Sequence, residues 1–133
     1  DLRVSAHFLI RRDGALVQFV AAGERAWHAG ASQWRGRERC NDYSVGIELE
    51  GTDERPYTAK QYARLAAVVR RLAARWPIEE VAGHSDVAPG RKTDPGPAFD
   101  RARLARLLAR GAAARVRVAG ASGAGGPLPA AGL

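Results

Sequence analysis

The stretch Ser44-Val-Gly-Ile-Glu-Leu-Glu50 alternates strictly between apolar and other residues, and it is the clearest strand signal in the chain. Apolar side chains at positions 45, 47 and 49 fall on one face of an extended strand, because successive side chains point to opposite faces. The opposite face carries two carboxylates, Glu48 and Glu50. We therefore expect a β-strand with two acidic groups on one side.

Two amphipathic helices are expected after this acidic strand. Thr58 is a typical N-cap, and residues 59–75 carry apolar side chains at helical spacing until Pro77 ends the pattern. A second helix is expected over residues 99–110, with Asp100 near its N-terminus. Each helix has one apolar face that can pack against other elements.

Three further strands are expected along the chain. Residues 3–10 and 15–20 are strand-like, and Asp13-Gly14 between them suits the positive φ angles of a tight hairpin turn. Residues 79–83 predict another short strand after the first helix. The expected order is therefore hairpin, strand, helix, strand, loop and helix.

The composition limits the class of protein. A length of 133 residues suits one domain, and the apolar runs are far shorter than the roughly 20 residues of a membrane span, so we expect a soluble protein without membrane contact. The single cysteine, Cys40, excludes an internal disulfide and favours a reducing compartment. From Ala112 the chain is rich in Gly, Ala and Pro. We therefore expect a domain over residues 1–111 and a flexible tail over residues 112–133.

The formal net charge of +7 would suit an acidic partner, either nucleic acid or a small anion. The arginines are scattered over the predicted helices, however, and they do not alternate with aromatic residues as in single-strand-binding surfaces. We interpret the basic character as a compositional feature, and we expect no nucleic-acid partner.

A loop carries ionisable groups among turn residues: Gly83-His-Ser-Asp-Val-Ala-Pro-Gly-Arg-Lys-Thr-Asp-Pro-Gly-Pro97. A loop that leaves a strand can direct an imidazole and a carboxylate at one point, and His84 and Asp94 have the ligand types that suit zinc. Structural roles remain open for both residues, as a histidine hydrogen-bonded at a strand end and as a turn aspartate before Pro95. Two ligands alone do not establish a zinc site.

Glu48 and Lys92 are candidates for the chemistry beside such a metal. A carboxylate on the sheet face can hold and deprotonate a water molecule, although Glu48 also suits a solvent-facing position and Glu50 shares its face. Lys92 can stabilise the charge that develops on a carbonyl oxygen, or it is a surface lysine. Of the other histidines, His7 suits a structural place in its strand. His28 suits either a groove wall or a backbone cap.

Four motifs stand out along the chain. In order, they are V-S-A-H-F-L-I-R-R-D-G (4–14), A-W-H-A-G (26–30), G-R-E-R-C-N-D-Y-S-V-G-I-E-L-E-G-T-D (36–53) and G-H-S-D-V-A-P-G-R-K-T-D-P-G-P-A-F-D (83–100). Together they resemble the zinc-dependent N-acetylmuramoyl-L-alanine amidase type 2 family, and within it the cytosolic 1,6-anhydro-N-acetylmuramyl-L-alanine amidase branch. The resemblance implies an α/β fold with a mixed central β-sheet flanked by helices.

The resemblance also implies roles for individual residues. His84 and Asp94 match two of the family's three zinc ligands. Glu48 matches the carboxylate that activates the water, and Lys92 matches the residue that stabilises the oxyanion. Motifs that line the substrate groove in this family, where arginines would suit peptide carboxylates, include Arg3, Trp27, His28 and Arg39.

One ligand of the family has no counterpart here. It is a histidine on an N-terminal strand, and it is expected upstream of Asp1, so the first strand would be absent from this chain. Three explanations are open: the chain is a fragment, it lacks the metal and only binds, or His7 or His28 supplies the third ligand. We favour the fragment, because the other site residues and their flanking motifs are intact.

The resemblance implies zinc-dependent hydrolysis of the amide bond between N-acetylmuramic acid, in its 1,6-anhydro form, and the L-alanine of muropeptides. The expected partner is thus a muropeptide, and the expected setting is peptidoglycan recycling in the cytoplasm. A peptidoglycan-binding module without catalysis is the alternative, because non-catalytic relatives typically lose a metal ligand. The sequence predicts no particular oligomeric state.

Overall fold

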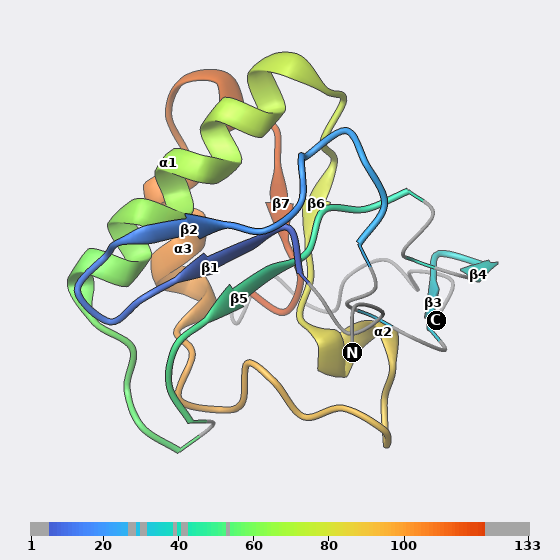
Figure 1. Ribbon diagram of the computed structural model, residues 1–133, viewed down its shortest axis with the longest axis horizontal. Helices are drawn as coiled ribbons and strands as arrows, with labels where there is room; N and C mark the ends of the chain where they lie inside the picture. The colour runs from blue at the N-terminus through green and yellow to red at the C-terminus, as the bar shows by residue number, and fades with distance from the viewer. Residues whose placement is uncertain are drawn as a thin grey trace.

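Strands and helices of the chain form a mixed α/β fold (Figure 1). The structure, a computed structural model, describes residues 6–26, 29, 32–38, 40, 43–52 and 54–121. The main sheet has the order β2-β1-β5. In it, β1 (Phe8–Ile10) runs antiparallel to β2 (Leu16–Gln18) and parallel to β5 (Ile47–Leu49). The hairpin and the acidic strand are therefore confirmed, although β2 and β5 are shorter than their predicted ranges, and residues 3–5 of the predicted first strand lie outside the described residues.

Two smaller sheets accompany the main one. Strand β6 (Glu80–Val81) pairs in parallel with β7 (Arg117–Val118), and β3 (Gln33–Trp34) pairs antiparallel with β4 (Arg37–Glu38). Strand β6 is the short strand that the sequence predicts over residues 79–83. Strand β7 lies in the segment that we expected to be a flexible tail.

Residues 111–121, here called the C-terminal arm, differ from that expectation. The arm begins with a 3-10 turn (Gly111–Ala113), and the side chains of Ala113, Val116 and Val118 are buried. The small side chains of alanine and glycine allow the arm to pack closely against its neighbours. Val116 and Val118 bury apolar surface, and the pairing of β7 with β6 adds backbone hydrogen bonds. Residues 122–133 of the expected tail lie outside the described residues.

Helix α1 (Ala59–Arg75) has the bounds that the periodicity predicts. Its N-cap Thr58 accepts a hydrogen bond from the Gln61 backbone N–H, and the Gln61 side chain accepts one from the Thr58 N–H. Gln61 is fully buried, and its Nε2 also donates to the carbonyls of Ile10 and Glu50. One side chain therefore ties the start of the helix to the ends of β1 and β5.

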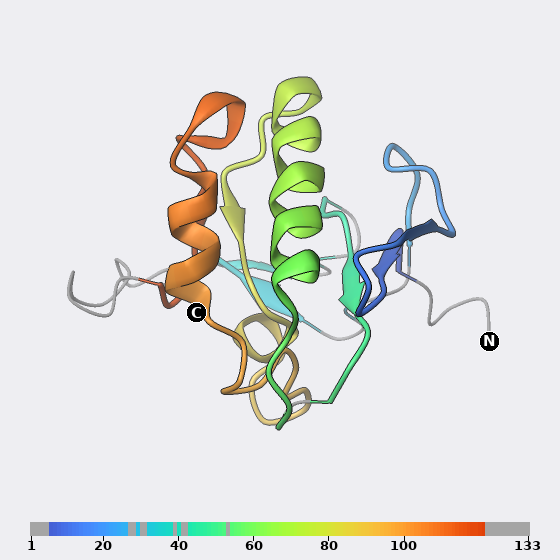
Figure 2. The ribbon, with the colours of Figure 1, turned by 90° about the vertical axis from the view of Figure 1, so that its left-hand side faces the viewer.

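The core lies between α1, α3 (Arg101–Leu108), β1 and the C-terminal arm. Figure 2 shows the two helices side by side, and Asp100 caps α3 as expected by accepting from the Arg103 N–H. The α3 helix is shorter than the predicted range of 99–110. The buried members of this cluster are Ile10, Leu65, Ala66, Val69, Ala73, Leu104, Leu108, Ala113, Val116 and Val118.

A cavity of about 530 Å³ lies between β5 and β6. Apolar side chains of α1, namely Leu65, Val69 and Leu72, line it together with both strands. Among the described residues, β5 pairs only with β1, and β6 only with β7. Each of these two strands therefore presents one edge without a sheet partner in this part of the chain, and the cavity separates the main sheet from the β6-β7 sheet.

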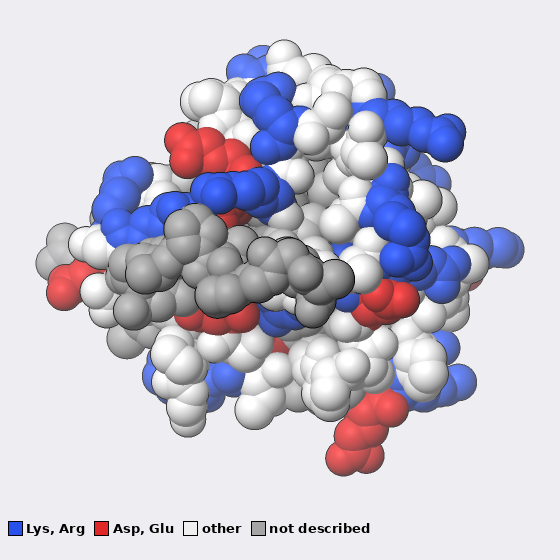
Figure 3. All heavy atoms as spheres, turned by 180° about the vertical axis from the view of Figure 1, so that it is seen from behind, with Lys and Arg blue, Asp and Glu red and all other residues white. Residues whose placement is uncertain are grey.

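Charged side chains are distributed over the surface with both signs. Figure 3 shows Lys and Arg side chains over one face, with Asp and Glu side chains among them. Several arginines donate to backbone carbonyls, such as Arg70 to Leu107 and Arg115 to Ala73. These arginines have structural partners on the helices. Among the described residues, none of the helices is both long enough and apolar enough to cross a membrane.

The two leucines at the end of α3 allow a matched test of this core. Leu108 is 1% exposed, whereas its neighbour Leu107 is 38% exposed. We predict that Leu108→Ala lowers the free energy of unfolding by about 2–5 kcal/mol, because it leaves a cavity between α3 and the C-terminal arm. Leu107→Ala should change it by less than about 1 kcal/mol. Urea denaturation measures both, and equal losses would contradict the packing described.

Candidate metal centre

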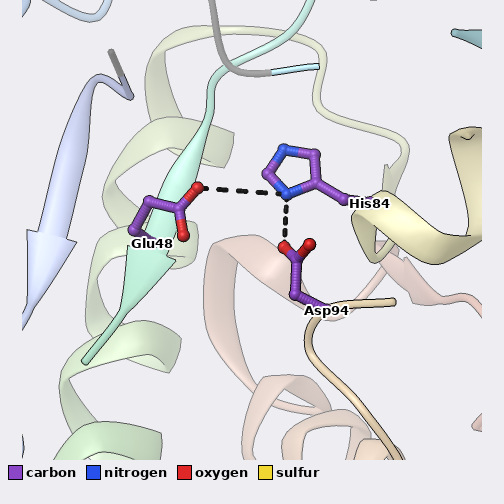
Figure 4. A group of neighbouring side chains, drawn as sticks. All are labelled: Glu48, His84 and Asp94. Atoms are coloured by element: carbon purple, nitrogen blue, oxygen red, sulfur yellow. Dashed lines mark hydrogen bonds and ion pairs between the residues drawn. The ribbon is translucent and has the colours of Figure 1, made fainter. Parts of the chain in front are cut away.

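Three side chains from separate parts of the fold lie close together (Figure 4), and all three line the cavity. Glu48 comes from β5, His84 begins the short helix α2 (His84–Val87), and Asp94 lies in the loop after it. The His84 Nδ1 lies 2.5 Å from the Asp94 Oδ2 and 4.0 Å from the Glu48 Oε1. One ligand atom from each residue lies within 4.8 Å of the other two. The structure thus brings together three of the residues selected from the sequence.

Strand geometry places Glu48. In the parallel pairing of β1 with β5, Leu9 lies opposite Glu48. The neighbouring Ile47 and Leu49 pack against the core cluster, so the alternation of the strand turns the Glu48 side chain to the other side. The carboxylate is therefore held on a paired strand, with about half of its side chain, 46%, exposed.

Close backbone packing places His84 and Asp94. The Ser85 N–H donates to the Asp94 carbonyl over 2.9 Å, which fastens the two ends of the loop together. A Cβ atom on Gly83 would lie only 2.5 Å from the Pro95 Cδ, so a glycine is required at this position. The Tyr57 hydroxyl also donates to the Pro95 carbonyl. Because the two segments touch, their side chains converge.

The first turn of the predicted irregular loop is helical. Helix α2 spans four residues, and His84 is the first of them. Sequence inspection missed this turn because the surrounding glycines and prolines suggest irregular backbone. A signal was available, however: Asp86 occupies the third position of the helix, where a carboxylate can accept the N-cap N–H.

The charges of the site act on one another. Burial raises the pKa of the Glu48 carboxyl above its ordinary value, and Asp94 raises it further, whereas His84 and Lys92 lower it. The hydrogen bond from His84 lowers the pKa of Asp94, and the charge of Lys92 acts in the same direction. Lys92 is thus electrostatically coupled to both carboxylates. Asp94 is ionised at neutral pH and available as a ligand.

The donor set fits a metal ion. An imidazole nitrogen and carboxylate oxygens are ligands that zinc accepts, and they also suit other divalent transition metals. The His84 ring is largely buried, with 11% of its side chain exposed, and the Asp94 carboxylate already faces its Nδ1. The residues present can therefore hold part of a metal coordination shell.

Glu48 and Glu50, which the sequence pattern could not distinguish, have different contacts in the structure. The Glu50 Oε1 accepts from the backbone N–H of Arg12 over 2.8 Å, so this carboxylate supports the hairpin turn. His7 is also structural, because its Nδ1 accepts from the Gly46 N–H and its Nε2 donates to the Glu24 carbonyl. Both ring nitrogens of this fully buried histidine are engaged. His7 is therefore unsuitable as a substitute metal ligand.

The four residues predicted to line a substrate groove lie outside the described residues. They are Arg3, Trp27, His28 and Arg39. Their roles remain predictions.

Comparisons with known proteins give the same family as the motifs. The family model described as N-acetylmuramoyl-L-alanine amidase matches residues 1–97. The 1,6-anhydro-N-acetylmuramyl-L-alanine amidase AmpD of Escherichia coli (strain K12) is 61% identical over 111 residues, which cover 82% of this chain and 61% of the relative. The chain therefore spans less than two thirds of the length of that protein.

Solved structures of amidases are similar to this chain as well. A crystal structure of a selenomethionine AmpD derivative matches with a TM-score of 0.74 and 58% identity, over 78% of this chain and 59% of that one. The Escherichia coli amidase AmiD, in a complex with anhydro-N-acetylmuramic acid-L-Ala-D-γ-Glu-L-Lys, matches with a TM-score of 0.76 and 37% identity, over 80% of this chain and 49% of that one. The chain belongs to the N-acetylmuramoyl-L-alanine amidase family of this fold.

Gly83 allows a test of the packing that forms the site. We predict that Gly83→Ala lowers the free energy of unfolding by about 1–3 kcal/mol, because its methyl group must displace Pro95. Gly23→Ala is the matched control, since a Cβ there would make an ordinary contact of 3.8 Å with Trp76. Denaturation of the metal-free proteins compares the two. Equal stabilities would show that the loop accommodates a side chain at residue 83.

Proposed function

We propose that this protein is a zinc-dependent amidase that cleaves the bond between N-acetylmuramic acid and L-alanine in muropeptides. The cluster of Glu48, His84 and Asp94 carries the proposal, because it brings potential metal ligands and a candidate base together in the lining of a cavity. Family membership and the similarity to AmpD support the same reaction. The name of that relative specifies the 1,6-anhydro form, and we extend this substrate, and a place in peptidoglycan recycling, to the present chain.

In this proposal His84 and Asp94 are zinc ligands, and a histidine upstream of Asp1 is the third. When bound, zinc would make a water molecule more acidic and polarise the scissile carbonyl. The cavity between β5 and β6 supports an additional segment, because a strand placed there would pair with both open edges and pass beside Glu48. Its apolar lining suits the inward face of such a strand.

Glu48 would act as the general base. Its carboxylate is held on β5, faces His84, and has a pKa raised mainly by burial, which brings it closer to neutral pH. It would take a proton from the attacking water and later deliver it to the departing amine. Lys92, whose charge already acts on this cluster, would stabilise the negative oxygen of the tetrahedral intermediate.

The remaining assignments follow the resemblance. Arg3, Trp27, His28 and Arg39 would line the substrate groove, and the arginines would bind peptide carboxylates. The protein would act in the cytoplasm on muropeptides, without a membrane or nucleic-acid partner. A steep salt dependence of DNA binding would contradict the last point.

A muropeptide-binding module without catalysis is the second candidate. It is favoured by one observation: among the described residues, the metal-ligand cluster contains a single histidine. The two candidates differ in whether Glu48 is needed for turnover.

Exchange of Glu48 tests the assignment of the base. In the complete protein, Glu48→Ala should reduce turnover of an anhydro-muropeptide by about 100- to 10,000-fold, while the zinc content stays unchanged. Glu50→Ala is the control next to the same strand, and it should retain turnover because the Glu50 carboxylate accepts from the hairpin backbone. Product formation measured by chromatography, together with metal analysis, gives both results. Retained turnover in Glu48→Ala would refute this role, and lost zinc would make Glu48 a ligand instead.

Zinc affinity tests the proposed third ligand. The 133-residue chain should bind zinc more weakly than a longer form that includes the upstream segment, because two protein ligands hold the ion less well than three. Competition with a chromophoric chelator measures both dissociation constants. Tight, stoichiometric zinc on the 133-residue chain would contradict the need for an upstream histidine.

A further inference from the structure

An ion pair lies directly behind the helix that carries His84. The Asp86 Oδ2 accepts from the Gly83 backbone N–H over 2.6 Å and from the Arg101 guanidinium over 2.7 Å. The same Arg101 nitrogen donates to the carbonyl of Ala119 over 2.6 Å. These bonds connect three parts of the chain: the residue before His84, the start of α3 and the C-terminal arm.

Two glycines make room for the Arg101 side chain. A Cβ on Gly83 would lie 3.1 Å from the Arg101 Nη2, and a Cβ on Gly120 would lie 3.1 Å from the Arg101 Cδ. Gly120 also has a φ angle of +74°, a conformation that glycine adopts without strain. The arginine is therefore enclosed between the backbone before His84 and the backbone of the C-terminal arm.

The short helix α2 depends on such external support. A helix of four residues cannot stand alone, because forming the first turn orders several residues for very few hydrogen bonds. Asp86 and Arg101 are mostly buried, with 24% and 20% of their side chains exposed. A charge-assisted bond in such surroundings is stronger than one between neutral groups. The pair can therefore fix the backbone from which His84 projects.

Arg101 also lines the cavity. Its Nη1, however, donates to Asp86 and to the carbonyl of Ala119. Because its Nη1 donates to both a carboxylate and a carbonyl, the side chain joins the loop to the C-terminal arm, and we assign it to support of the loop rather than to substrate binding.

We propose that Asp86 and Arg101 are positioning residues that hold His84 in the orientation needed to bind the metal, and that the C-terminal arm completes this support through Ala119. The inference rests on the proposed metal centre, and it adds residues to which the family comparison assigns no role. Support of a ligand by groups behind it is typically worth 10- to 100-fold in metal affinity.

Three variants of the complete protein test this inference, with Arg106→Gln as the control. Arg106 lies on the same helix and is exposed, so its exchange removes the same charge without touching α2. We expect Arg101→Gln to weaken zinc binding by about 10- to 100-fold relative to this control. Arg101→Lys should recover part of the affinity, since lysine keeps the charge but not the planar geometry of the donors. Asp86→Asn should also weaken zinc binding, because asparagine keeps the shape of the side chain but loses its charge.

Two measurements separate positioning from a loss of stability. Zinc dissociation constants come from chelator competition, and the melting temperatures of the zinc-free variants show how well each one folds. Positioning predicts weaker zinc binding in Asp86→Asn even when its zinc-free melting temperature matches that of the control. Zinc affinities equal to the control in both Asp86→Asn and Arg101→Gln would overturn this inference and leave the proposed function unaffected. Failure of the unaltered protein to bind zinc would overturn both this inference and the proposed function.

Discussion

The site depends on the contact between Gly83 and Pro95. His84 and Asp94 are ten residues apart, and they meet only because the two backbone segments that carry them touch. A side chain at residue 83 would hold these segments apart. The Ser85 N–H bond to the Asp94 carbonyl then fixes their register. Once this contact exists, the orientation of the imidazole toward the carboxylate follows from the backbone path.

The site combines one residue on a paired strand with one residue on an isolated helical turn. Glu48 lies on a strand paired with β1, and the buried Gln61 binds the end of that strand to α1. His84 lies on a single helical turn, which Asp86 and Arg101 connect to the C-terminal arm. The arm lies beyond residues 1–97, which the family model matches. A segment outside the matched region is therefore joined by hydrogen bonds to the helix that carries His84, a proposed metal ligand.

Local patterns in the sequence predicted the elements whose cause is local. Strict alternation gave the acidic strand, and helical spacing after Thr58 gave both ends of α1. Alternation could not separate Glu48 from Glu50, because both lie on the same face. Only the long-range bond from the Arg12 N–H shows that Glu50 is committed to the hairpin. The bond between Arg101 and Asp86 is also long-range, because it joins residues from separate helices. The sequence alone therefore could not have revealed it.

The composition of the C-terminal arm predicted a flexible tail, and for residues 112–121 this prediction was wrong. Small side chains can pack where large ones cannot. Alanine loses no side-chain entropy on burial, and close approach of the backbone compensates for its small apolar area.

The cavity between the main sheet and the β6-β7 sheet connects the open strand edges to the candidate site. Glu80 of β6 is almost fully buried there and pairs with Arg35 and Arg117. Yet among the described residues the Arg35 Nε and the Glu80 Oε2 have no hydrogen-bond partner. Each such buried polar atom costs about 1–3 kcal/mol, so the two sheets gain stability from any segment that supplies backbone partners between them. Glu48 borders this cavity on β5, and His84 follows β6 on its other side. A strand paired with both β5 and β6 would therefore fix the separation of these two residues, so that one interaction would join the two sheets and set the geometry of the proposed metal centre.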